Sequence, residues 1–106
     1  MTRTEPRQLV YDQRFKKDLK SLKHRQADQR ALSEVIEWLR NDVPLPARCR
    51  LHALKGKYAD VLECHVRPDL LLLFDRSGNE LRLMRIGSHA KLFRQYIGLR
   101  TSPLTH

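Results

Sequence analysis

Cysteine is scarce in this chain, long apolar runs are missing, and acidic residues are few. The 2 cysteines, Cys49 and Cys64, lack CxxC spacing, and nothing in the sequence indicates an oxidising compartment. We therefore predict two reduced thiols, with Cys64 as a small core residue.

The lack of a long apolar segment bears on membranes and export. The longest apolar run, Leu70 to Phe74, is far too short to cross a bilayer, so no membrane partner is expected. The first residues, MTRTEPRQ, contain no apolar segment of the kind that a secretory signal needs. Together these absences predict a cytoplasmic protein.

The shortage of acidic residues leaves a strongly basic chain. Lysine and arginine number 21 against 12 aspartates and glutamates, which gives a net charge of +9. An excess of this size costs self-repulsion in the folded state and is typical of proteins that bind nucleic acid. The length of 106 residues predicts a single domain, with a core at about 7–97 and frayed ends.

The first half of the chain predicts a short strand followed by two helices. Residues 7–11 alternate in hydropathy, and Asp12 then suits a helix N-cap whose carboxylate accepts from backbone N–H groups of the first turn. A break at residues 24–26 precedes the second helix, which ends before Pro44 because proline disfavours helix in the residue before it. Apolar residues recur at helical spacing in both helices: Phe15, Leu19 and Leu22, then Leu32, Val35, Ile36 and Leu39.

After residue 50 the apolar period changes to two, which predicts strands. The expected strands are 62–66, 70–74 and 81–86, with turns at 67–69 and 75–79. Residues 89–96 fit either a strand extension or a helical turn, and Leu92 fits ordinary core cover. The order β-α-α-β-β-β predicts an α+β domain in which a helical hairpin packs on a mainly antiparallel sheet.

Side chains suited to phosphodiester chemistry occur along this extended half. If the last strand stays regular, Arg85 and His89 point the same way and project into one cleft. His65 points away from the core side chains of its strand, and Asp69, just past the turn, can fold back toward it. Gly87 is expected to let the backbone approach a substrate closely. His52 completes the set.

This set of residue types matches the needs of RNA cleavage by the 2′-hydroxyl. The reaction requires a base for that hydroxyl, an acid for the departing 5′-oxygen, and a cation near the phosphorane oxygens. Imidazole, with a pKa of about 6.5, serves either proton role near neutral pH, and arginine offers a planar fork of donors to phosphate. No metal or other cofactor is needed, because the RNA supplies the nucleophile.

Each of these residues also has a structural explanation. A single strand histidine is more often hydrogen-bonded than catalytic, and Arg85 could simply pair with Asp69 or Glu63. Lysines on a helix face are often only solvated. Zinc binding is the rival use of histidines, but the spacing of His52, His65 and His89 matches no compact ligand motif.

Three spaced motifs carry a family resemblance. Residues 51–56 are LHALKG, residues 63–69 are ECHVRPD, and residues 83–93 are LMRIGSHAKLF. They resemble the patterns H-x-L-x-G, H-x-x-P-D and R-x-G-[ST]-H-x-x-L-F of the YafQ branch of the RelE/ParE toxin superfamily. The resemblance covers about residues 9–96 and includes the N-terminal strand and the basic helical hairpin.

The resemblance implies a RelE-like fold and the toxin of a type II toxin–antitoxin pair. Such a toxin is a ribosome-associated endoribonuclease that cuts translated mRNA and is silenced by a cognate antitoxin, so mRNA and ribosomal RNA are the other expected partners. The expected catalytic residues are His65, Asp69, Arg85 and His89. The expected RNA-binding residues are His52, Lys55, Lys57, Arg67, Lys91, Phe93, Lys16 and Lys20.

Within this scheme, His65 and His89 are expected to form the acid–base pair, in an order that the sequence leaves open. Asp69 either orients a histidine or is itself the base, and Arg85 stabilises the phosphorane. Family members often carry an aromatic residue directly after the motif aspartate. This chain has Leu70 there, which weakens the case for a base-stacking role at that position.

Two other functions are compatible with parts of the sequence. ParE-like relatives share the fold and poison DNA gyrase without nuclease chemistry, and a non-catalytic RNA-binding domain would share the positive charge. Neither needs the set of acid–base residues found here, so we expect the nuclease.

Overall fold

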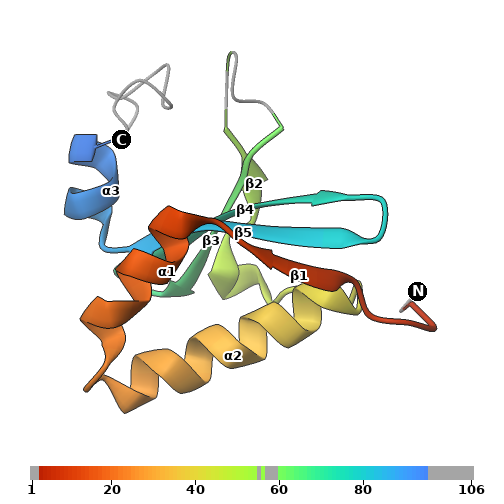
Figure 1. Ribbon diagram of the computed structural model, residues 1–106, viewed down its shortest axis with the longest axis horizontal. Coiled ribbons are helices and arrows are strands. Elements are labelled where there is room, and N and C mark those ends of the chain that lie inside the picture. The colour runs from red at the N-terminus through yellow and green to blue at the C-terminus, as the bar shows by residue number, and fades with distance from the viewer. Residues whose placement is uncertain (1–2, 55, 57–59, 96–106) are drawn as a thin grey trace.

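The computed structural model describes residues 3–54, 56 and 60–95, the last three by their backbone alone. Its elements are β1 (Gln8–Tyr11), α1 (Gln13–Leu19), η1 (Lys20–Leu22), α2 (Gln26–Arg40), η2 (Ala47–Cys49), β2 (His52–Ala53), β3 (Leu62–Arg67), β4 (Leu70–Ser77), β5 (Glu80–Gly87) and α3 (His89–Gln95). The strands form one sheet in the order β1-β5-β4-β3-β2, with α1 and α2 on the same side of it (Figure 1).

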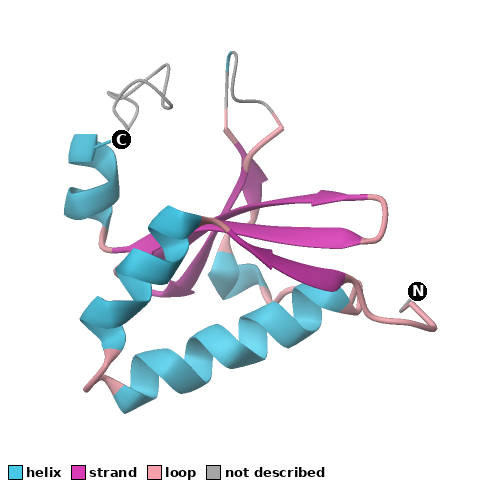
Figure 2. Ribbon diagram, in the orientation of Figure 1, coloured by secondary structure: helices cyan, strands magenta, loops and turns pink. Residues whose placement is uncertain are grey.

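The predicted α+β class, the helical hairpin and the mainly antiparallel sheet are confirmed (Figure 2). β1 runs parallel to β5, whereas the other strand pairings are antiparallel. Three elements go beyond the predicted order: the short helix η2, the two-residue strand β2, and α3, which shows that the segment left open in the sequence is helical over His89–Gln95. No helix in the described part of the chain has the length and apolar character needed to span a membrane.

The central strand β4 supplies apolar side chains to both faces of the sheet. Leu72 and Phe74 belong to the larger core cluster, which α1 and α2 cover, and Leu71 and Leu73 belong to a smaller cluster on the opposite face. All four are at most 3% exposed, so β4 is buried on both faces, as its continuous apolar run indicates. Leu92 of α3 lies in the smaller cluster, as predicted.

The two cysteines are buried and free, as the sequence predicts. Burial raises the pKa of Cys64 to about 12, so its thiol stays protonated at neutral pH. Cys64 therefore acts as a small apolar residue of the larger core cluster.

One predicted helix cap is wrong. Asp12 occupies the N-cap position of α1, but its side chain makes no capping hydrogen bond. Its carboxylate lies 4.0 Å from the Nε atom of Arg82 on β5. The cationic side chain of Arg82 thus accounts for the orientation of the Asp12 carboxylate, which the local sequence did not predict.

Asp18 joins α1 to the edge of β5. β1 pairs with β5 only as far as Leu83, so the next part of β5 faces α1 instead of a strand. There the Asp18 carboxylate accepts from the N–H of Ile86 at 3.0 Å and from Nε and Nη2 of Arg85 at 2.6 and 2.9 Å. Lys91 of α3 places its Nζ 3.1 Å from the same carboxylate. One side chain therefore positions α1, β5 and α3 together.

The charge of Asp18 is stabilised despite its burial. Burial by itself raises the pKa of Asp18, but the hydrogen bonds from Arg85, Ile86 and Lys91 outweigh burial and hold the pKa below its ordinary value. Asp18 is 3% exposed and Arg85 is 5% exposed, so the two form a buried ion pair. Such a pair is costly to break, because removing one partner leaves a buried charge without compensation.

We expect Asp18→Asn to lower the free energy of unfolding by about 3–5 kcal/mol, because the guanidinium of Arg85 then stays buried without its counter-charge. Urea denaturation measures the loss. Asp12→Asn is the matched control at a half-exposed carboxylate of the same helix, and it should cost at most about 1 kcal/mol.

The fall of the free energy of unfolding at acidic pH, here called the acid limb, gives a second measurement on the same ion pair. Asp18 titrates at about 3.8 in the unfolded chain and lower in the folded one, so its contribution is complete above that pH and is lost as pH falls through the lowered pKa. A loss below about 1 kcal/mol in Asp18→Asn, with an unchanged acid limb, would show that the pair does not hold the fold together.

Candidate active site

His65 lies on the sheet face opposite α2, in β3 opposite Leu71 of β4. The prediction that His65 points away from the face of Cys64 is confirmed. Partial burial lowers the pKa of His65, and the positive charges of Arg50, His89 and His52 lower it further, against a hydrogen bond to the backbone of Pro68. The ring is therefore biased toward its neutral form, which can accept a proton.

His52 is held in one orientation by two acceptors. In β2 it lies directly opposite Glu63 of β3, and its Nε2 is 2.8 Å from Oε1 of that buried carboxylate. Its Nδ1 is 2.7 Å from the carbonyl oxygen of Arg50. The two contacts engage both ring nitrogens of His52. The ring of His52 is thus held in place, half exposed to solvent, on the same face of the sheet as His65.

His89 is positioned through its backbone at the first residue of α3. Asp69 lies in the turn between β3 and β4, and its Oδ1 accepts from the N–H of His89 at 3.1 Å. The Ser88 hydroxyl oxygen accepts from the N–H of Lys91 at 3.1 Å, which caps the same helix. Asp69 therefore joins the β3–β4 turn to the start of α3.

Arg85 does not follow the predicted alternation. Leu73 of β4 pairs with Arg85 of β5, but the next residue, Phe74, pairs with Leu83. Met84 therefore has no partner in β4 and forms a β-bulge in β5. The strand then ends at Gly87 and His89 already belongs to a helix. The expectation of one regular strand that aims Arg85 and His89 alike is therefore wrong, and Arg85 is joined to Asp18.

Gly87 has a packing role that the sequence did not predict. A Cβ atom at this buried position would lie 3.2 Å from Cδ of Lys91 and 3.4 Å from Cδ2 of Leu92. The close approach that the missing side chain permits in this structure is the packing of α3 on the end of β5, and the approach of a substrate to Gly87 stays a prediction. The stem of Lys91 crosses Gly87 and carries its ammonium group to Asp18.

The other predicted RNA-binding residues differ in how far the structure describes them. Lys16 and Lys20 are exposed on α1 and η1. Lys55 and Lys57 lie outside the described residues, as does the side chain of Phe93.

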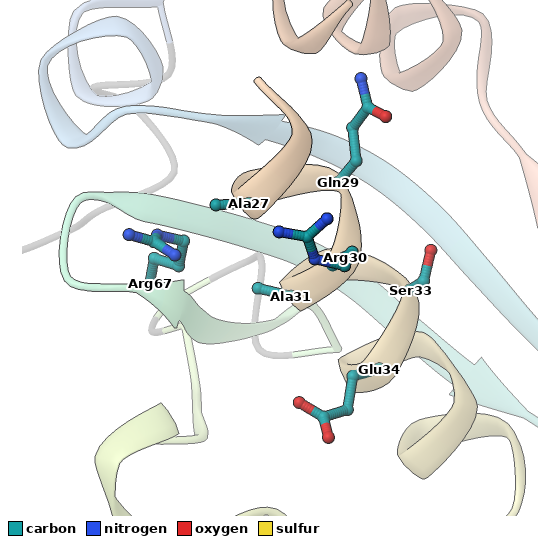
Figure 3. Close-up of a pocket in the computed structure, with 7 residues that line it drawn as sticks. All are labelled: Ala27, Gln29, Arg30, Ala31, Ser33, Glu34 and Arg67. Carbon is teal, nitrogen blue, oxygen red and sulfur yellow. The ribbon is translucent and has the colours of Figure 1, made fainter. Parts of the chain in front are cut away.

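Arg67 is exposed at the end of β3, and its Nε lies 3.0 Å from Oδ1 of Asp28 on α2. Figure 3 shows Arg67 beside α2, on the side of Ala27 and Ala31, where it helps to line an open cavity of about 730 Å³. Leu70, the first residue of β4, is 6% exposed and packs in the larger core cluster. Its side chain therefore supports the core and is not placed to stack on a base.

Two buried carboxylates on the helices were not predicted from the sequence. Asp18 falls between Phe15 and Leu22 on the apolar face of α1, and Asp28 shares a face of α2 with Leu32. A charged residue at an apolar position of a helix is the signal that would have found them, because such a residue needs a cationic partner. The partners are Arg85 for Asp18, and Arg25 and Arg67 for Asp28.

Within residues 3–54, 56 and 60–95, no group of three or more histidine, cysteine, aspartate or glutamate side chains is arranged to hold a metal ion. The ring of His52 instead contacts two protein acceptors, and His65 is partly buried. Their arrangement on a basic α+β domain is suited to proton transfer next to an anionic substrate.

The fold and these residues define a small basic toxin of the RelE-like class. The family model for the bacterial toxin of type II toxin–antitoxin systems, YafQ, matches residues 7–94. The mRNA interferase toxin YafQ of Escherichia coli is 34% identical over 88 residues, which cover 82% of this chain and 96% of the relative. A putative toxin YafQ of Haemophilus influenzae is 29% identical over 98 residues, covering 86% and 96%.

Solved structures agree. The E. coli DinJ–YafQ toxin–antitoxin complex superposes with a TM-score of 0.74 at 33% identity, covering 84% of this chain and 99% of that one. A copper-bound mutant toxin from Helicobacter pylori gives 0.76 at 40% identity, covering 82% and 99%. This chain belongs to the YafQ family of type II toxins, which confirms the predicted family.

We expect the imidazole of His65 to titrate below the ordinary value of 6.5, because burial and three neighbouring cations disfavour its charged form. NMR titration of the ring signals measures the midpoint. Arg50→Gln should move that midpoint upward, since Arg50 is one of the cations, whereas the remote exposed change Arg30→Gln should not. A midpoint at or above 6.5 in the unchanged protein would contradict this description of the site.

Proposed function

We propose that this chain is an endoribonuclease that cleaves mRNA, the toxin of a type II toxin–antitoxin pair. The E. coli relative that spans most of this chain carries the name mRNA interferase toxin. The observation that carries the proposal is the environment of His65, a partly buried imidazole within electrostatic reach of two further histidines and an arginine. A non-catalytic binder or a gyrase inhibitor has no need of such a group.

The lowered pKa of His65 suggests an order for the acid–base pair. A neutral His65 takes the proton of the 2′-hydroxyl, and the oxygen then attacks the adjacent phosphorus. His89 donates a proton to the departing 5′-oxygen, which leaves a 2′,3′-cyclic phosphate and a 5′-hydroxyl. Side chains of this kind are sufficient for the reaction, and no metal is required in this mechanism.

Positive charge on the protein stabilises the phosphorane and holds the RNA. His52, fixed between Glu63 and Arg50, positions the substrate beside His65. Arg85 supplies a guanidinium that Asp18 holds in a preorganised orientation, so little reorganisation is needed when charge develops. The other proposed RNA contacts are Lys16, Lys20, Lys55, Lys57, Arg67, Lys91 and Phe93.

The partners follow from the same proposal. The E. coli relative is solved in complex with the antitoxin DinJ, and we infer a cognate antitoxin for this chain. An acidic or mixed antitoxin segment would bind the basic surface through complementary charge. The substrate is mRNA on the ribosome in the cytoplasm, with ribosomal RNA as a further contact.

His89→Ala should lower the rate of mRNA cleavage by about 10²–10⁴, because it removes the proton donor of the leaving group. Single-turnover cleavage of translated mRNA measures the effect. The melting temperature should stay unchanged, since the contact with Asp69 uses the backbone N–H of His89. His24→Ala is the matched control at an exposed histidine. Arg85→Ala is a poor test, because it also unpairs the buried Asp18.

A folded His89→Ala protein that cleaves mRNA at the unchanged rate would remove His89 from the mechanism.

Asp69 offers a test that separates orientation from proton transfer. Asparagine keeps an oxygen that can accept from the N–H of His89, whereas it cannot act as a base at neutral pH. We therefore expect Asp69→Asn to keep most of the cleavage rate and Asp69→Ala to lose it. Equal losses of at least about 10²-fold in both variants, with both proteins folded, would instead assign Asp69 the role of the base.

A further inference from the structure

The turn between β3 and β4 contacts two histidines that lie on different elements. The ring of His65 in β3 is hydrogen-bonded to the backbone of Pro68. The next residue, Asp69, accepts from the N–H of His89 at the start of α3. The position of this one turn therefore bears on both histidines.

The strand that leads into the turn is irregular. The register of β3 with β4 shifts between His65 and Arg67, which pair with adjacent residues of β4. Val66, between them, thus has no partner in β4 and forms a bulge, which interrupts the ladder and bends the strand. The sheet alone therefore does not fix the course of the chain from His65 into the turn.

Asp28 of α2 supplies a contact at this point. The carboxylate is 8% exposed, and its Oδ1 lies 3.0 Å from Nε of Arg67. Its Oδ2 lies 2.7 Å from Nε of Arg25, three residues earlier in the chain. Because Arg25 is local, the carboxylate is held in one orientation by its own helix and is preorganised to receive Arg67.

Open space surrounds the side chain of Arg67. It helps to line cavities of about 730, 560 and 280 Å³ next to α2 and the turn. Figure 3 shows it reaching along α2, on the side of Ala27 and Ala31. Close packing therefore contributes little to the placement of Arg67, and its ion pair with Asp28 sets the position of the end of β3.

We propose that Asp28 is a positioning residue, which acts through Arg67 to fix the turn at residues 67–69 and so orients His65 and His89 relative to each other. The assignment of these two histidines as the acid–base pair rests on the proposed function. The placement of the turn by Asp28 rests on the contacts of the free protein.

The test uses Asp28→Asn, which removes the charge and keeps the shape of the side chain. The side chains of Arg67 and Arg25 are 47% and 67% exposed, so both stay hydrated when the pair is lost, and the melting temperature should not change. Glu37→Gln is the matched control, because it removes an equal charge from α2 and a similar pair with Arg40. Arg67→Gln and the double variant complete a cycle.

One arm records NMR spectra of the free protein. Residues at the start of a helix lack intrahelical acceptors for their N–H groups, so the amide signal of His89 reports the contact with Asp69. Asp28→Asn should shift this amide proton upfield and move the ring signals of His65, as should Arg67→Gln, and the double variant should shift them no further. Unchanged signals in Asp28→Asn, or additive shifts in the double variant, overturn the proposal.

The other arm measures single-turnover cleavage of mRNA. Asp28→Asn should lower the rate at saturating RNA by up to about 10²-fold, the cost of a small misplacement of catalytic groups, and the control should not. The RNA concentration for half-saturation should stay unchanged, and a loss confined to RNA affinity overturns the proposal. Failure of the unchanged protein to cleave mRNA would refute the proposed function instead, and the NMR arm would still decide whether Asp28 positions the turn.

Discussion

Asp18 accepts from Arg85 and Ile86 of β5 and contacts Lys91 of α3, so one buried carboxylate fixes three elements at a point where the sheet would otherwise end in an open strand edge. The interaction is demanding, because both members of the Asp18–Arg85 pair are removed from water and neither can lose its partner cheaply. The Asp18–Arg85 pair also bears on the position of His89 in the candidate active site. α3 begins with His89, and the helix is held on β5 by the contact of Lys91 with Asp18 and by the close packing on Gly87.

Each histidine of the site is fixed by a different physical means. His65 is controlled by burial and by the cations around it, His52 by two hydrogen-bond acceptors, and His89 by the backbone contact with Asp69. The residues that make these contacts lie on separate strands and in the turn between β3 and β4, so the site is assembled only once the sheet has formed. A rigid sheet under adaptable connections is a common basis for placing catalytic side chains.

The sequence predicts most of the fold because periodicity reports burial directly. The helical spacing of Phe15 and Leu22 and the continuous apolar run of β4 correspond to buried positions in the structure. Periodicity fails where the backbone departs from regularity. The extra residue Met84 changes the direction of Arg85, and the two-residue strand β2 is too short to produce a pattern.

The site was predicted less completely than the fold, for a related reason. The motifs with His65, Asp69 and His89 can be recognised in the sequence, but their partners are far away in it. Asp18 lies 67 positions from Arg85, and a polar residue inside an apolar stripe gives only a weak local signal. The pairing of His52 with Glu63 likewise depends on strand register, which hydropathy alone does not fix to the residue.

Mapping of mRNA ends after brief induction of this chain tests most directly whether His65 and His89 cut RNA through its own 2′-hydroxyl. We expect new fragments of translated mRNA whose downstream pieces begin with a 5′-hydroxyl and whose upstream pieces end in a 2′,3′-cyclic phosphate or 3′-phosphate. Growth arrest with intact mRNA and a DNA damage response would contradict it and would indicate an inhibitor of gyrase instead.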